Sequence, residues 1–149
     1  MLWQILNPVV AGSAPSEDVR DRCIRNKWLL KADLTDEELK NEYLGATCSI
    51  LPFDYSSGGK LKLLKSLAYG VPFLATSIVG SPLNGLPEIC LYSDDPEQWV
   101  QAVENLIETG VGFAAQKKLA AIASEFSWAA LAGAMASEIE GHYESQGLS

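Results

Sequence analysis

Short apolar segments alternate with amphipathic, helix-like segments along the chain, and this alternation limits the folds open to it. The apolar segments are rich in β-forming residues and end at glycine or polar residues, so we expect each to form a buried strand. Strands that alternate with helices form a parallel sheet covered on both faces. The sequence therefore predicts a doubly wound α/β fold. The expected strands are residues 8–12, 27–32, 47–53, 72–78 and 88–93, and the expected helices are residues 13–26, 34–46, 59–69, 94–110, 111–126 and 127–145.

Capping residues mark where several of these helices begin and end. Ser16 precedes two acidic residues, and Asp95 precedes Pro96, which is the pattern of an N-cap followed by the first helical turn. Gly70 follows the helix at 59–69 and predicts its end, because glycine adopts the left-handed conformation that closes many helices. The remaining expected caps are Thr35 or Asp36 for residues 34–46 and Ser127 for residues 127–145.

The composition favours one domain over residues 1–149 without a metal or a cofactor. A chain of 149 residues can bury one ordinary core. Its net charge of −8 makes nucleic acid or an anionic membrane an unfavourable partner, since both attract basic surfaces. The cysteines, at positions 23, 48 and 90, are too far apart for a C-x-x-C pair, and His142 is the only histidine. Ligands for a metal site of the Cys/His kind are therefore missing.

No apolar run in the sequence reaches the roughly 18–20 residues that a membrane-spanning helix needs. The apolar amino terminus lacks the basic residues that open a signal peptide, and Pro8 interrupts it. We therefore expect a cytoplasmic protein with reduced, buried thiols. Trp28, Trp99 and Trp128 fall on apolar faces and are expected in the core.

The junction Ser56-Ser57-Gly58-Gly59-Lys60 lies between a predicted strand and a predicted helix. A helix N-terminus offers unpaired N–H groups and a partial positive charge, and glycines let an anion approach the backbone. Serine hydroxyls, Lys60 and the nearby Lys62 add donors, so the junction predicts a phosphate cradle. It is not a Walker A loop, because Phe53 replaces the first glycine and Leu61 follows the lysine. A serine cap with a tight glycine turn also fits, and the residues alone leave both interpretations open.

The order of these segments is that of a known family. "AYGVPFLAT", at the end of the helix and start of the next strand, is similar to the motif A-x-G-x-P-V-V-A-T, and "DDPEQWVQAVENLIETG" and "FSW" follow in the family's order. From about Val9 to Tyr143 the chain resembles the carboxy-terminal, donor-binding domain of retaining glycosyltransferases of group 1, which have the GT-B fold. The resemblance implies a Rossmann-like domain that binds the diphosphate of a nucleotide sugar and transfers the sugar without a metal.

Two departures separate this sequence from the family pattern. The family places a glutamate at each of two positions around the helix start, and these positions hold Ser57 and Lys65 here. The second glutamate holds the ribose of the donor in that family, whereas a lysine can only donate hydrogen bonds. The resemblance therefore carries over the phosphate end of the site, at Gly58, Gly59, Lys60 and Lys62, and puts ribose recognition in doubt.

The resemblance also implies a truncated chain. The first strand and helix of the family's donor domain would lie before Leu2, and the acceptor-binding half of the enzyme would precede them. Without that strand the family order 3-2-1-4-5-6 becomes 2-1-3-4-5, which is itself a stable doubly wound sheet. The first and third strands would then be neighbours, and the loop at 12–16, with Gly12 and Ser13, would face the junction at 54–60 across one crevice. A set of glycine-rich turns without a ligand also fits this pattern.

Two functions follow from the sequence. In the first, the chain is a glycosyltransferase-like domain that holds the diphosphate of a nucleotide sugar, and an acceptor domain, a partner chain or a second copy completes the enzyme. In the second, it is a non-catalytic module that binds a phosphorylated molecule or a protein. The missing glutamates favour the second function, and the family pattern elsewhere favours the first.

Overall fold

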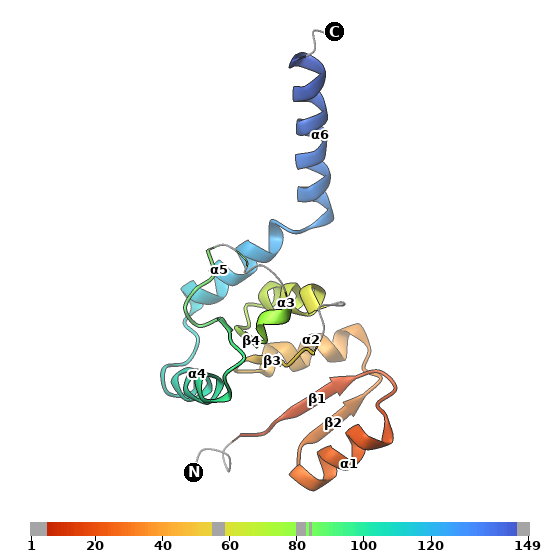
Figure 1. The fold of residues 1–149 in the computed structure, drawn as a ribbon, viewed down its shortest axis with the longest axis vertical. Helices are drawn as coiled ribbons and strands as arrows, with labels where there is room; N and C mark the ends of the chain where they lie inside the picture. The colour runs from red at the N-terminus through yellow and green to blue at the C-terminus, as the bar shows by residue number, and fades with distance from the viewer. Residues whose placement is uncertain (1–5, 55–58, 80–82, 84, 146–149) are drawn as a thin grey trace. The chain divides into compact units, whose positions relative to one another are not determined.

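The computed structural model describes residues 6–54, 59–79, 83 and 85–145, except the side chains of residues 59, 60, 128 and 138–145. Strands and helices alternate as the sequence predicts, and every strand pair is parallel (Figure 1). The chain divides into two compact units, Met1–Gly45 and Ala46–Ser149, each of which is a small α/β assembly. The single domain expected over residues 1–149 stays a prediction.

The first unit consists of two strand–helix pairs. Their elements are β1 (Val9–Gly12), α1 (Glu17–Asn26), β2 (Leu29–Ala32) and α2 (Asp36–Gly45). The strands pair in parallel from Val9 opposite Leu29 to Gly12 opposite Ala32. Cys23 is the only buried side chain among the residues described in this unit, so these residues form almost no core of their own.

Side-chain caps fix the helix starts of this first unit. The Ser16 hydroxyl accepts a hydrogen bond from the Val19 N–H at 3.4 Å, which confirms the predicted cap of α1. At α2 the Thr35 N–H donates to Glu38 at 2.8 Å and the Glu38 N–H donates back to the Thr35 hydroxyl at 3.3 Å. This capping box settles the cap of α2 on Thr35 rather than Asp36.

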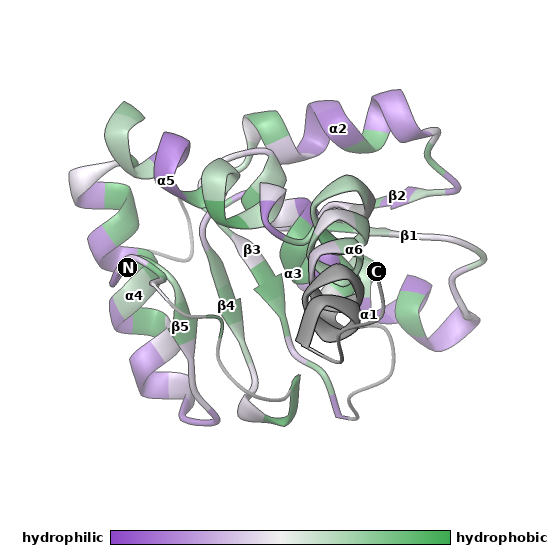
Figure 2. Ribbon diagram, turned by 90° about the horizontal axis from the view of Figure 1, so that it is seen from above, coloured by the Kyte–Doolittle hydropathy of each residue, from purple (hydrophilic) through white to green (hydrophobic). Residues whose placement is uncertain are grey.

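The second unit holds a three-stranded sheet and most of the helices. Figure 2 shows β3, β4 and β5 side by side, with hydrophobic residues along β3 and β4. The elements of the unit are β3 (Ser49–Leu51), α3 (Gly59–Ala68), β4 (Phe73–Ala75), the 3-10 helix η2 (Ser77–Val79), β5 (Leu91–Tyr92), α4 (Pro96–Thr109), α5 (Phe113–Ser124) and α6 (Trp128–Ser145). Asp95 caps α4 with Pro96 in its first turn, as predicted.

The two observed sheets agree with part of the predicted strand order. The hydrogen-bonded orders are β1-β2 and β3-β4-β5, which are the two ends of the expected order 2-1-3-4-5. The continuous five-stranded sheet, with β1 next to β3, stays a prediction. The fifth strand is shorter than predicted, because a turn at Pro87–Cys90, closed by a 3.0 Å backbone hydrogen bond, replaces its first residues.

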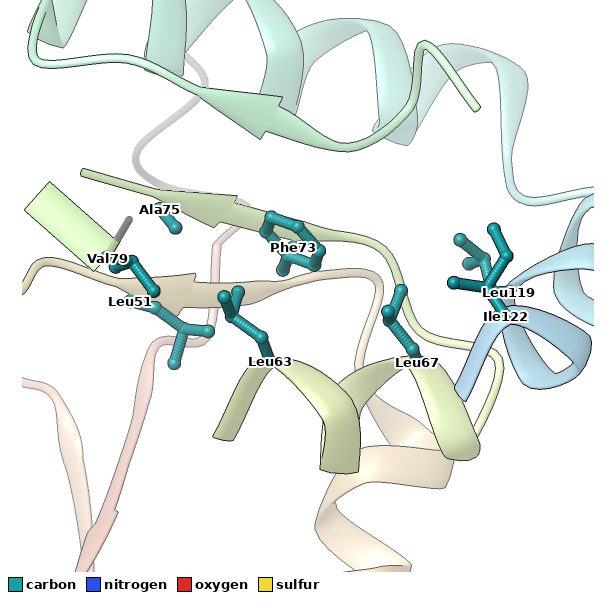
Figure 3. Close-up of a cluster of buried hydrophobic side chains, with 8 residues drawn as sticks. All are labelled: Leu51, Leu63, Leu67, Phe73, Ala75, Val79, Leu119 and Ile122. Atoms are coloured by element: carbon teal, nitrogen blue, oxygen red, sulfur yellow. The ribbon is translucent and has the colours of Figure 1, made fainter. Parts of the chain in front are cut away.

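The core of the second unit surrounds β4. Phe73, Leu74 and Ala75 have no solvent exposure, so both faces of this central strand are covered. Figure 3 shows the face on which Phe73 and Ala75 meet the helices. The buried side chains of this cluster are Leu51, Leu63, Leu67, Phe73, Ala75, Val79, Leu119 and Ile122.

The expectation that the tryptophans lie in the core is wrong for Trp28, which is 41% exposed. Among the described residues of its unit only Cys23 is buried, so they form no core that could receive an indole ring. Trp99 is half-buried and donates its indole N–H to the Ser93 carbonyl at 2.8 Å, which satisfies its polar edge. The side chain of Trp128 lies outside the described residues.

The turn between α3 and β4 requires a glycine. Gly70 has a φ of +71°, and a Cβ added there would meet Gln116 of α5 at 3.1 Å from its Cβ and 3.3 Å from its carbonyl oxygen. The Ser66 hydroxyl donates to the Val71 carbonyl at 3.0 Å and holds the same turn against the end of α3. This turn therefore seats α5 against α3.

We expect Gly70→Ala to lower the free energy of unfolding more than Gly85→Ala does. Gly85 has a φ of +72° but nothing within 4 Å of an added Cβ, so it carries only the backbone strain. That strain costs about 1–2 kcal/mol, and crowding against Gln116 adds about 1–3 kcal/mol at Gly70. Urea unfolding of both variants measures the difference, and equal losses would contradict the crowding argument.

Candidate functional site

The carboxyl ends of β3, β4 and β5 meet at one edge of their sheet, because the three strands are parallel. Ligands of open α/β sheets bind at this edge, outside the ends of the strands. The connections that leave it are residues 52–58 after β3, residues 76 onward after β4 and residues 93–95 after β5. This edge of the second unit is the candidate site.

Thr76 connects the end of β4 to the loop that follows β3. Its hydroxyl accepts a hydrogen bond from the Phe53 N–H at 3.0 Å and donates one to the Phe53 carbonyl oxygen at 2.8 Å. A single side chain thus holds both backbone polar groups of Phe53. The loop toward α3 therefore leaves the sheet from a fixed point.

Ser77 makes the corresponding connection toward β5. The Asp94 carboxylate accepts a hydrogen bond from the Ser77 N–H at 2.9 Å and a second, shorter one from the Ser77 hydroxyl. These bonds favour the charged carboxylate and lower the pKa of Asp94, the hydroxyl bond contributing most. Two successive residues after β4 therefore hold the loops of both neighbouring strands.

α3 begins at the candidate site. Gly59 is its first residue, and no acidic residue lies in its first turn. Lys62 is exposed, and its ammonium lies 5.3 Å from the centroid of the Phe53 ring. The predicted cradle residues Ser56, Ser57 and Gly58 lie outside the described residues, as does the side chain of Lys60. The cradle therefore stays a prediction. Of its two predicted lysines, Lys62 is the one whose side chain the structure describes.

Lys65, at the position of the family's ribose glutamate, lies on α3 one turn after Lys62 and is half-buried. Its place on the helix agrees with the sequence prediction. Its role in recognition of a nucleotide stays a prediction.

The other predicted phosphate contacts, Gly12 and Ser13, lie at the carboxyl end of β1 in the first unit and are exposed. The next residue, Ala14, has a φ of +44° and donates its N–H to the Asp33 carboxylate at 2.9 Å. Asp33 follows β2 and donates its own N–H to the Gly12 carbonyl at 3.0 Å. A carboxylate thus occupies one N–H group of this loop, and the predicted crevice shared with the loop after β3 stays a prediction.

Sequence reasoning did not select Phe53, Thr76 and Asp94 for the site. Thr76 ends the "AYGVPFLAT" motif, and Asp94 was read only as part of a helix start. A hydroxyl directly after a buried strand is the signal that points to them, since such a group reaches the neighbouring loops. The partner of that hydroxyl, 23 residues away, appears only in the structure.

Burial raises the pKa of both Cys48 and Cys90 to about 11, so these thiols are poor nucleophiles near neutral pH. In the described ranges no three histidine, cysteine or acidic residues are grouped so that they could hold a metal ion.

Within the described part of the chain, no single helix is long and apolar enough to cross a membrane. The helix α5 and residues Ala129–Ser137 of α6, which are bent by 53° relative to each other, satisfy length and composition only as a pair.

We expect the Ser77–Asp94 connection to make stability depend on pH in the acid range. The pKa of Asp94 lies below its ordinary value of 3.8 in the folded protein. Its contribution to stability is therefore full above pH 3.8 and is lost as the pH falls through the lower folded pKa. Asp94→Asn should remove this dependence, and Asp54→Asn serves as a control of equal charge at the same edge. Urea unfolding between pH 7 and pH 2 tests this, and an unchanged pH profile in Asp94→Asn would contradict it.

Comparison with known proteins now identifies the family. A search of curated proteins finds no match. The sequence matches the family model of glycosyl transferases group 1 over residues 4–109, which include both units' sheets, α3 and α4. The match covers more than half of the 149 residues. The chain therefore belongs to the group 1 glycosyltransferase family.

Proposed function

We propose that this chain is a donor-binding domain that holds the diphosphate of a nucleotide sugar where β3 passes into α3. The observation that carries the proposal is the exposed Lys62 near the start of α3, a helix without an acidic first turn. This helix begins at the carboxyl edge of the sheet, where open α/β sheets bind ligands, in a chain of a glycosyltransferase family. An anion at this edge gains from the positive end of the helix and from the lysine charge.

A comparison with the other α-helices that follow a strand, α1, α2 and α4, supports this choice of helix. The first turns of α1, α2 and α4 carry acidic residues, which already balance the positive ends of those helices. The acidic residues in these first turns are Glu17 and Asp18, then Asp36, Glu37 and Glu38, and then Glu97. The start of α3 instead adds Lys60 and Lys62 to the helix charge, so an external anion is the natural counter-charge.

The proposal places transfer of the sugar in a GT-B enzyme that retains the configuration of the donor and needs no metal. An acceptor-binding domain, supplied by a partner chain or reached through a homodimer, would complete it, so the isolated chain should have little or no activity. Gly12 and Ser13 join the site if the five strands form the order 2-1-3-4-5. A cytoplasmic location belongs to the same proposal, because nucleotide sugars are made there.

A second candidate function is a phosphate- or protein-binding module without transfer activity. The observation that favours it is the pair Ser57 and Lys65, where the family has carboxylates. A lysine cannot accept hydrogen bonds from ribose hydroxyls, so a nucleotide would lose contacts that an inorganic diphosphate never makes. Affinities for the two ligands therefore separate the candidates.

We expect Lys60→Ala to weaken binding of uridine diphosphate and of inorganic pyrophosphate by about ten-fold or more, since charge-assisted hydrogen bonds contribute roughly 1.5–3 kcal/mol. Lys117→Ala is the control, because it removes the same charge from an exposed lysine on another helix, α5. Calorimetric titration measures both affinities. An absence of binding heat in the parent protein, or equal affinities in the parent and Lys60→Ala, would refute the cradle.

We expect Lys65→Glu to improve the affinity for uridine diphosphate and leave the affinity for pyrophosphate unchanged or slightly lower. The new carboxylate could accept hydrogen bonds from a ribose, whereas pyrophosphate has none. The same calorimetric titrations report both values. Equal changes for the two ligands would show that position 65 acts through charge alone.

A further inference from the structure

The loop after β3 is held by two contacts on one residue. The Thr76 hydroxyl bonds both the N–H and the carbonyl oxygen of Phe53, at 3.0 and 2.8 Å. Phe53 is half-buried and packs against the core cluster, which limits the movement of its ring. The Lys62 ammonium lies over this ring at 5.3 Å from its centroid. A series of contacts therefore runs from the Thr76 hydroxyl through the backbone and ring of Phe53 to the Lys62 ammonium.

The direction of the Lys62 side chain follows from helix geometry. Cα–Cβ bonds tilt toward the N-terminus of a helix, so the side chain of the fourth residue of α3 reaches back over the first turn. A lysine there would otherwise sample many rotamers in water. The aromatic face gives its ammonium one preferred position while leaving it exposed.

From this series we infer that Phe53 and Thr76 are positioning residues for the Lys62 ammonium. Thr76 fixes the backbone of Phe53, Phe53 fixes its own ring, and the ring holds the cation at the start of α3 before any anion arrives. We call Thr76 and Phe53, which together hold this cation, the brace. An ordered cation loses less conformational entropy when it binds an anion, so the brace raises the affinity for the anion without contacting it. Only the identity of this ligand, a diphosphate, rests on the proposed function.

The first experiment needs no ligand. In the parent protein the Lys62 ε-methylene protons should resonate upfield of a free lysine, because they lie over an aromatic face. Phe53→Leu should abolish this shift, Thr76→Val should reduce it, and Thr76→Ser should keep it because the hydroxyl remains. Lys117 over Phe113 is the internal control, and its shift should not change in any of these variants. An unchanged Lys62 shift in Thr76→Val overturns the inference.

The second experiment is a double-mutant cycle for binding of inorganic pyrophosphate. Thr76→Val should weaken binding roughly two- to five-fold, the range expected for an exposed cation–π contact. In a Lys62→Ala background the same substitution should have no further effect, because the group that Thr76 positions is gone. Additive losses would mean that Thr76 acts on the fold in general and would overturn the inference.

The two experiments separate failure of the inference from failure of the proposed function. If the parent protein binds no pyrophosphate, the proposed function fails, while the Lys62 resonance still decides whether the brace exists. If pyrophosphate binds and the Lys62 resonance does not respond to Thr76→Val, the inference about the brace is wrong while the proposed function stands. Phe53→Leu covers the case in which Thr76→Val unfolds, since it removes the ring and leaves the Thr76 hydroxyl in place, and an unchanged Lys62 resonance in that variant would overturn the inference.

Discussion

Complete burial of β4 is the constraint on which the second unit depends. Phe73, Leu74 and Ala75 alternate between two faces, yet none of them has contact with solvent. Burial of a large apolar side chain contributes about 1.5–3 kcal/mol, so a strand covered on both sides fixes its neighbours strongly. Leu63 and Leu67 of α3 and Leu119 of α5 pack into the cluster on the Phe73 side. Thr76 and Ser77 directly follow this strand. Their hydrogen bonds to Phe53 and Asp94 connect the buried strand to the residues that follow β3 and β5.

The charge at the start of α3 differs from that at the helix starts of the first unit. At β1 and β2 the Asp33 carboxylate takes up the Ala14 N–H, and acidic residues open both following helices. At β3 the helix opens without an acidic residue and with lysines instead. In a protein with a net charge of −8, a local cationic start to one helix is a specific feature, because the long-range field of the chain repels anions. Under the proposed function, the protein would therefore recognise a diphosphate at short range.

The sequence predicted the fold well where local rules decide it. The caps Ser16 and Asp95 and the closing Gly70 were readable because each depends on a few neighbouring residues. Tertiary contacts decided the rest. Trp28 looked like a core residue, but core burial needs partners that its unit lacks. The role of Thr76 depends on a residue 23 positions away, and no periodicity in the sequence connects the two. The serines of the junction lie outside the described residues, so their role stays a prediction.

The hydrogen bonds between Thr76 and Phe53 also order the steps of folding. They join residues 23 positions apart, on either side of α3, and can form only after β3 and β4 have paired in parallel. Such non-local pairs close late, because the entropy of the intervening chain must be lost first. We therefore expect the contact between Thr76 and Phe53 to form after these two strands have paired and to open before they separate when the protein is heated. Under the proposed function, affinity for a diphosphate would then decline at temperatures where the buried strand is still intact, so binding would have a narrower temperature range than the fold.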